Sequence, residues 1–180
     1  MKRTKMLAVA MALLGGTTTE SAMAAPKGNS VPKEVQEMDC LVGKWSGDAT
    51  MKMGPDAAKV KITWDCTRAS GDYGVACKAV MKGVPGMAAY QETDLFGYDP
   101  GAKKYHWFSV TNAGETHDHQ APAPAGNKIE FVYNGLQEGK PFKEVIDLAF
   151  ADDSKSFELA SETFVDGKST SLLHGTASKK

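Results

Sequence analysis

Two neighbouring segments of the chain alternate apolar and polar residues with a period of two, and both agree on how they would pair. In ITWDCTRASGDYGVACKAV, a tight turn at Gly71-Asp72 sets Cys66 opposite Cys77. The same register sets Trp64 opposite Ala79. These side chains all fall on the apolar face, and register is strongly specified wherever one face of a strand is buried. The stretch therefore predicts an antiparallel hairpin with one face in a core.

This register brings two of the three cysteines together. We predict a disulfide between Cys66 and Cys77, which would persist in an oxidising compartment. The alternative is that the two thiols pack in the core as small apolar groups. Cys40 is unpaired in either case.

Alternating segments continue along the rest of the chain, separated by turn residues such as those of GPDA, YDPGAK and VDGKS. Ahead of them, EVQEMDCLVGK has apolar residues at helical spacing and predicts one short helix. About ten antiparallel strands joined by hairpins form a meander, which hides its edges best by closing into a barrel. We therefore predict an all-β, up-and-down barrel with a short N-terminal helix, and a two-sheet sandwich is the alternative. The predicted strands are Lys44–Met53, Ala58–Thr67, Tyr73–Lys82, Met87–Phe96, Lys103–Thr111, Glu115–Gln120, Lys128–Asn134, Phe142–Phe150, Ser156–Val165 and Ser169–Ala177.

The N-terminus has the pattern of a secretory signal peptide. Three basic residues precede the apolar run MLAVAMALLGG, and SAMAA supplies small residues for cleavage after Ala24. The apolar run is about half of the ~20 residues that a bilayer crossing needs. We expect an exported protein, periplasmic or secreted, with a signal peptide over residues 1–24, a flexible segment over 25–33 and a single barrel domain over 34–180.

The charged residues argue against anionic partners. Arg68 is the only arginine after the predicted signal peptide, and bidentate recognition of phosphate leans heavily on arginine. Because no basic stretch compensates, the sequence predicts neither a nucleic-acid nor an anionic-membrane partner. No later segment is long and apolar enough to predict a membrane span.

The stretch ETHDHQ places His117 and His119 one residue apart on a predicted strand. A hairpin centred on Ala113-Gly114 would set Phe108 opposite His119 and bring His106 diagonal to it. Alternation then puts all three imidazoles on one face. Such a trio can bind zinc or copper and leave a position for water or substrate. The alternative is that these histidines lie at a barrel mouth and simply contact water.

Two further polar residues fall among apolar neighbours. Glu144 alternates with Phe142 and Ile146, so we expect it on the core face, where an unpaired carboxylate is costly. A partner, a raised pKa or a bulge that turns it outward would resolve that cost. His174, in SLLHGT, shares the face of Leu172 and would point inward as a polar spot in the cavity.

Two motifs carry a family resemblance. In LVGKWSGDAT, Gly43 and Trp45 resemble the Gly-x-Trp opening of lipocalins and related calycin barrels, and with Gly47 they resemble nitrobindin-like haem barrels. DLFGYDPGAKKYHWFSVTNAGE is similar to an uncharacterised bacterial family of exported calycin-like barrels, a domain of unknown function. The resemblance covers the chain from about Met38 to its end and implies a barrel with a cavity rather than a reaction.

The lipocalin and nitrobindin resemblances also imply roles for single residues. The nitrobindin resemblance would make His174 a haem ligand. In lipocalins an arginine from the last strand often covers the opening tryptophan, whereas SLLHGTASKK supplies only lysines. For Gly43 and Trp45 we expect a structural role, since a large indole can plug a barrel end and glycine lets the backbone bend beside it.

Catalytic motifs are absent from the sequence, which contains no nucleophile elbow, P-loop, Rossmann fingerprint or zinc-protease helix. We therefore expect a non-catalytic, lipocalin-like barrel that binds a small, mainly apolar molecule and requires no cofactor. The alternatives are a zinc- or haem-binding barrel and a solid barrel that acts as an interaction module. The expected ligand-binding residues are Trp64, Tyr105, Trp107, Phe131, Glu144, Ile146, Leu148 and His174.

Overall fold

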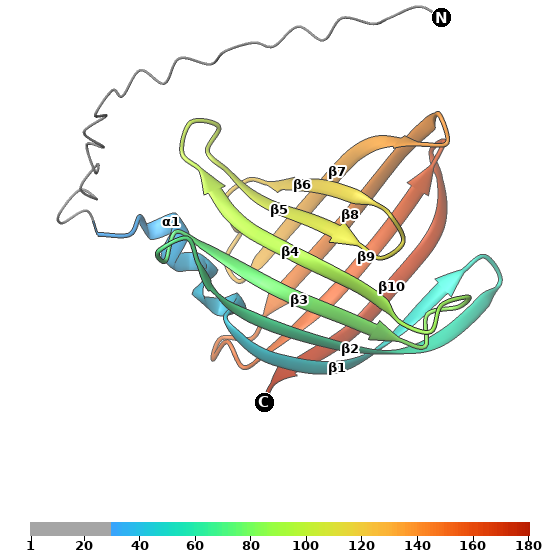
Figure 1. The fold of residues 1–180 in the computed structure, drawn as a ribbon, viewed down its shortest axis with the longest axis horizontal. Coiled ribbons are helices and arrows are strands. Elements are labelled where there is room, and N and C mark those ends of the chain that lie inside the picture. The colour runs from blue at the N-terminus through green and yellow to red at the C-terminus, as the bar shows by residue number, and fades with distance from the viewer. Residues whose placement is uncertain (1–29) are drawn as a thin grey trace, which may run out of the picture. The chain divides into compact units, whose positions relative to one another are not determined.

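Ten antiparallel strands follow one another around a closed barrel in the computed structural model, which describes residues 30–180 (Figure 1). Each strand pairs with its neighbours in the chain, and β1 pairs with β10 to close the sheet. The predicted up-and-down barrel is therefore confirmed, and the structure is not a two-sheet sandwich. The strands are β1 (Gly43–Met53), β2 (Asp56–Ala69), β3 (Gly74–Lys82), β4 (Tyr90–Asp99), β5 (Lys104–Thr111), β6 (Thr116–Ala121), β7 (Lys128–Gln137), β8 (Lys140–Phe150), β9 (Ser156–Val165) and β10 (Lys168–Lys179).

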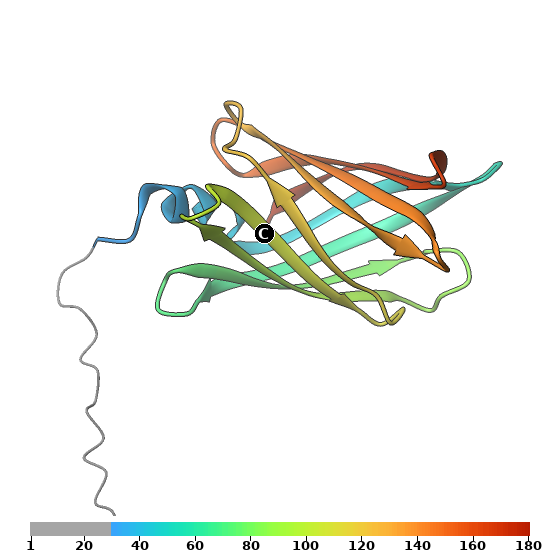
Figure 2. The same ribbon diagram turned by 90° about the horizontal axis from the view of Figure 1, so that it is seen from above.

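One short helix, α1 (Lys33–Glu37), continues into a 3₁₀ turn (Met38–Leu41) and lies at one end of the barrel (Figure 2). Its apolar side chains are buried, and Arg68 of β2 holds it in place. The Arg68 guanidinium donates a hydrogen bond of 3.2 Å to the Val35 carbonyl oxygen and forms an ion pair with Asp39. The predicted helix is thus present and anchored to the sheet.

The predicted signal peptide, residues 1–24, and most of the predicted flexible segment, residues 25–33, lie outside the described residues. Within residues 30–180, no helix is both long and apolar enough to cross a membrane.

The β2–β3 hairpin has the predicted register, with Cys66 opposite Cys77 and Trp64 opposite Ala79. The two cysteines form a disulfide, whose Cα atoms are 4.0 Å apart. Closing a loop with a sequence separation of 11 stabilises the fold by about 3 kcal/mol on loop-entropy grounds. Cys40 has no disulfide partner in the described part of the chain.

Trp45 fills the barrel near the helix. It is 2% exposed, and its indole Nε1 donates a hydrogen bond of 2.7 Å to the Leu41 carbonyl oxygen. Lys179, from the last strand, places its Nζ 4.9 Å from the centre of the indole ring, so a lysine covers the tryptophan here. Gly43 has φ +135°, a conformation that an L side chain rarely adopts.

A layer of aromatic side chains crosses the middle of the barrel. Trp107 is at its centre, with its ring 4.9 Å from Phe96, 5.5 Å from Trp64 and 5.6 Å from Phe131. The interior contains a cavity on each side of this layer. One, of about 590 Å³, lies beside the helix, and the other, of about 570 Å³, lies toward the opposite end. The barrel is therefore solid in its middle and hollow toward both ends.

Candidate functional site

The cavity remote from the helix has one mainly apolar arc and one polar arc, which holds the titratable side chains of the lining. The apolar arc comes from β1–β3, β9 and β10 and includes Met51, Ile62, Trp64, Met81, Leu159 and Leu173. The polar arc comes from β4–β6, β8 and β9 and includes Tyr90, Glu92, Ser109, His117, His119, Glu144 and Ser161. Among the described residues that line this cavity there is no lysine or arginine. A volume of about 570 Å³ falls within the ~300–1,000 Å³ typical of small-ligand pockets.

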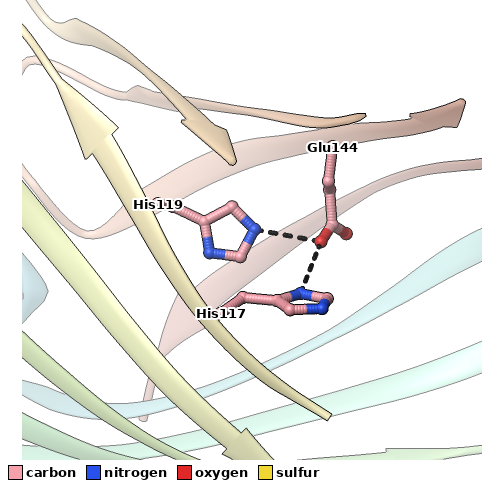
Figure 3. Close-up of side chains that lie close together, drawn as sticks. All are labelled: His117, His119 and Glu144. Carbon is pink, nitrogen blue, oxygen red and sulfur yellow. Dashed lines mark hydrogen bonds and ion pairs between the residues drawn. The ribbon is translucent and has the colours of Figure 1, made fainter. Parts of the chain in front are cut away.

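Glu144 is the centre of a hydrogen-bonded cluster on the polar arc (Figure 3). Its Oε2 lies 2.9 Å from His119 Nε2 and 3.4 Å from His117 Nδ1. Its Oε1 accepts a hydrogen bond of 3.2 Å from the Ser161 hydroxyl. Glu144 thus lies on the inner face of β8, as its alternation predicted, and no bulge turns it outward.

The histidine contacts explain how a buried carboxylate stays ionised. Burial raises the pKa of Glu144, but the hydrogen bonds from His117 and His119, together with the electrostatic effect of these imidazoles, outweigh it and lower that pKa to about 2. His117 is held by stacking on Tyr133, with ring centres 4.2 Å apart and planes 16° apart. His119 packs against Trp107 and is 2% exposed, and its Nδ1 has no hydrogen-bond partner within residues 30–180.

Two further carboxyl groups face inward from β4. Burial, reinforced by the charge of Glu144, raises the pKa of Glu92, while a hydrogen bond of 2.8 Å from the Tyr90 hydroxyl opposes this shift. Burial and the neighbouring Glu92 raise the pKa of Asp94 to about 8. Asp94 Oδ1 accepts a hydrogen bond of 2.9 Å from Trp107 Nε1. Asp94 therefore holds its proton at neutral pH.

Glu92 and Asp94 were not among the sequence-based candidates, although a signal was present. In YQETDLFGYD they alternate with Tyr90 and Phe96, so the period of two would have put both carboxyl groups on the core face. The same pattern had identified Glu144 on its own strand.

The predicted histidine trio is corrected by the register of the β5–β6 hairpin. His119 lies opposite Trp107 rather than Phe108, a shift of one residue. Thr111 donates its backbone N–H to the Glu115 carbonyl oxygen at 3.0 Å, so the loop has three residues and ends on Gly114, with φ +86°. A three-residue loop that ends in the left-handed region is a common hairpin connection, and it differs by one residue from the two-residue turn that we had assumed.

This shift separates His106 from the other two histidines. Adjacent strand residues point to opposite faces, so His106 lies on the outer surface, where its Nδ1 is 2.9 Å from Asp118 Oδ1. Glu144, from a different strand, takes the third place beside His117 and His119. Their three donor atoms lie within 4.8 Å of one another.

The predicted inward orientation of His174 is wrong. His174 is exposed together with Leu172, whereas Leu173, Gly175 and Ala177 face inward. Only one of the two adjacent leucines can point into the barrel, and Leu173 takes that place because neighbouring strand residues point to opposite faces. A haem in the interior could not reach His174 on the outer face.

The remaining predicted ligand-binding residues face inward, all buried except the half-buried Glu144, but they divide between the two cavities. Trp64, Trp107, Glu144 and Ile146 line the cavity remote from the helix. Tyr105, Phe131 and Leu148 line the cavity beside the helix, where the Tyr105 hydroxyl donates a hydrogen bond of 2.5 Å to Glu37.

A closed, ten-stranded antiparallel barrel with a short N-terminal helix and internal cavities defines a calycin-like barrel. Residues 32–117 match a family model described as "Protein of unknown function (DUF1579)". The predicted resemblance to an uncharacterised family of calycin-like barrels is thereby confirmed. No curated protein matches the chain.

Two solved structures share the fold. The crystal structure of Rv2717c from M. tuberculosis matches with a TM-score of 0.62 and 13% identity, over 84% of this chain and 99% of that protein. The S-type phycobiliprotein lyase CPES from Guillardia theta matches with a TM-score of 0.53 and 11% identity, over 81% of this chain and 91% of that protein. At these identities the likeness shows the fold alone.

Proposed function

We propose that the protein binds a small, mainly apolar molecule in the cavity remote from the helix. The observation that carries this proposal is the division of that cavity into an apolar arc and a polar arc around about 570 Å³. A mainly apolar lining with a few convergent polar groups is the usual composition of a small-molecule site. The barrel then acts as a carrier or store rather than as an enzyme.

The charges of the lining favour one kind of polar group on the bound molecule. Glu144 is ionised and Glu92 and Glu115 also line the cavity, while no lysine or arginine does so among the described residues. A buried anionic head group would meet these acids without a full positive partner, which is costly. The bound molecule therefore carries a neutral or cationic polar end, and simple fatty acids are disfavoured.

The disulfide supports a location outside the cytoplasm. Disulfides persist in the periplasm and in secreted proteins and are rare where thiols are kept reduced. With the disulfide between Cys66 and Cys77, an exported carrier is the form of the proposal that fits best.

A pair of variants on one strand tests the proposal. Met81 of β3 lines the cavity, whereas Lys78 of the same strand is exposed on the outer face. We expect the wild-type protein and Lys78→Trp to bind one molecule of the neutral probe N-phenyl-1-naphthylamine, and Met81→Trp to lose this binding because its bulkier indole takes up space in the cavity that the probe needs. The measurement is a fluorescence titration in EDTA, with the anionic anilinonaphthalene sulfonate in parallel. Equal binding of the neutral probe by both variants would contradict an interior site, and preference for the anionic probe would contradict the expected polar end.

A further inference from the structure

Three metal-ligating atoms converge at one point on the cavity wall. His119 Nε2 and His117 Nδ1 approach the same oxygen, Glu144 Oε2, at 2.9 and 3.4 Å. Ligand atoms about 2.0–2.1 Å from a tetrahedral zinc ion lie about 3.3 Å from one another. The two separations bracket that value, and all three donor atoms lie within 4.8 Å of one another, so side-chain adjustment would let them surround one ion.

The donor types select a class of metal. Two imidazole nitrogens and one carboxylate oxygen suit divalent transition metals such as zinc, whereas calcium and magnesium prefer all-oxygen sites.

The three side chains are held in place before any ion binds. Ser161 donates its hydrogen bond to Glu144 Oε1 and thus leaves Oε2 directed at the histidines. His117 is stacked on Tyr133, with ring centres 4.2 Å apart, and also contacts the tilted ring of Phe142 at 5.3 Å. Such outer contacts orient ligands and are a regular part of metal sites.

The three donor residues also lie on one side of the cavity. All three donors come from β6 and β8, and all three residues line the cavity, so an ion held by them would keep its remaining positions directed into that cavity. No lysine or arginine among the described lining residues would repel it. We propose that His117, His119 and Glu144 bind one divalent transition-metal ion of the zinc class, with its other coordination positions open to the cavity.

This site goes beyond the binding of an apolar molecule and does not depend on it. The same three residues could instead serve only as a hydrogen-bonded network that satisfies a buried glutamate, and the experiment has to separate these two roles. His106 offers a matched control, because it too pairs an imidazole with a carboxylate, Asp118, but on the outer face of the adjacent strand.

The test is a titration of tag-free, EDTA-treated protein with Co²⁺, followed by its visible absorption, and competition with Zn²⁺. We expect one tightly bound ion per chain in the wild type and in His106→Ala. Glu144→Gln and His117→Ala should each weaken binding more than ~100-fold, beyond the 10–100-fold effect of residues that only orient ligands. Near-UV circular dichroism shows whether each variant keeps the native fold, and Glu144→Gln preserves the shape of the side chain.

A second readout is thermal unfolding in the presence of Zn²⁺. Zn²⁺ should raise the melting temperature of the wild type and of His106→Ala, because an ion that binds only the folded state stabilises it. Absence of Co²⁺ binding in the folded wild type, or equal binding by Glu144→Gln, would overturn the proposal and leave the hydrogen-bonded network. Because the apolar-probe titration is run in EDTA, failure of the metal site would leave the carrier function standing, and the reverse also holds.

Discussion

The carboxyl groups of the cavity differ because their neighbours differ. Glu144 meets two imidazoles and a hydroxyl and stays ionised, whereas Asp94 has only the indole N–H of Trp107 and retains its proton. Alternation along a strand predicted that Glu144 faces inward. Its partners could not be predicted, because they come from other strands and depend on register across the barrel.

Asp94 gives a prediction about pH. Its folded-state pKa of about 8 lies above its usual value of 3.8, so the folded state holds more protons than the unfolded state between these two values. The free energy of unfolding therefore falls as pH rises through that window, by up to roughly 1.4 kcal/mol per pH unit. Asp94→Asn removes this loss, so its stability relative to wild type should increase steadily from about pH 4 to pH 8.

Urea denaturation at several pH values measures this difference, with Asp65→Asn, on the exposed face of β2, as a control. A difference between Asp94→Asn and wild type that stays constant across the window would show that Asp94 is not held protonated.

At the scale of elements, loop length decided which strand pairings were predictable. In the β2–β3 hairpin, two strands with clear alternation agree on a single register, and the disulfide follows from it. In the β5–β6 hairpin the predicted two-residue turn is in fact a three-residue loop that ends on Gly114, and one residue of shift moved His106 to the outer face. The predicted inward orientation of His174 on β10 was wrong for a related reason. Leu172 and Leu173 are adjacent, so the apolar pattern alone does not show which of them faces inward.

The closing seam between β1 and β10 depends on small residues. A Cβ atom at Gly47 would lie 1.8 Å from the Thr176 carbonyl oxygen, so the two strands approach each other more closely than any side chain allows. This close approach explains why glycine, rather than a residue with a side chain, occupies position 47 of the LVGKWSGDAT motif.

We predict that Gly47→Ala lowers the free energy of unfolding by about 2 kcal/mol or more, because the clash is with backbone that must shift. Gly97→Ala, on β4, is the matched control, since a Cβ there meets nothing within 4 Å. Chemical denaturation compares the two variants, and equal stabilities would show that the seam tolerates a side chain.

At the scale of the whole molecule, the sequence predicted the strand number, the closed barrel and the inward faces of most strands. It did not predict that the interior divides in two. Tyr105 and Trp107 face inward from the same strand, yet they line different cavities, because a layer of packed aromatic rings crosses the barrel between them. The position of a side chain along the barrel axis depends on the stagger of all the strands, and this stagger cannot be predicted from one segment alone.

The most direct test of the carrier function is native mass spectrometry of the protein isolated from its own host, without denaturation. We expect the folded chain to carry one small molecule, to retain it in Lys78→Trp and to lose it in Met81→Trp, whose indole occupies the same space. Recovery of the wild type and both variants without any bound molecule would contradict the proposal that the cavity beside Glu144 holds a ligand.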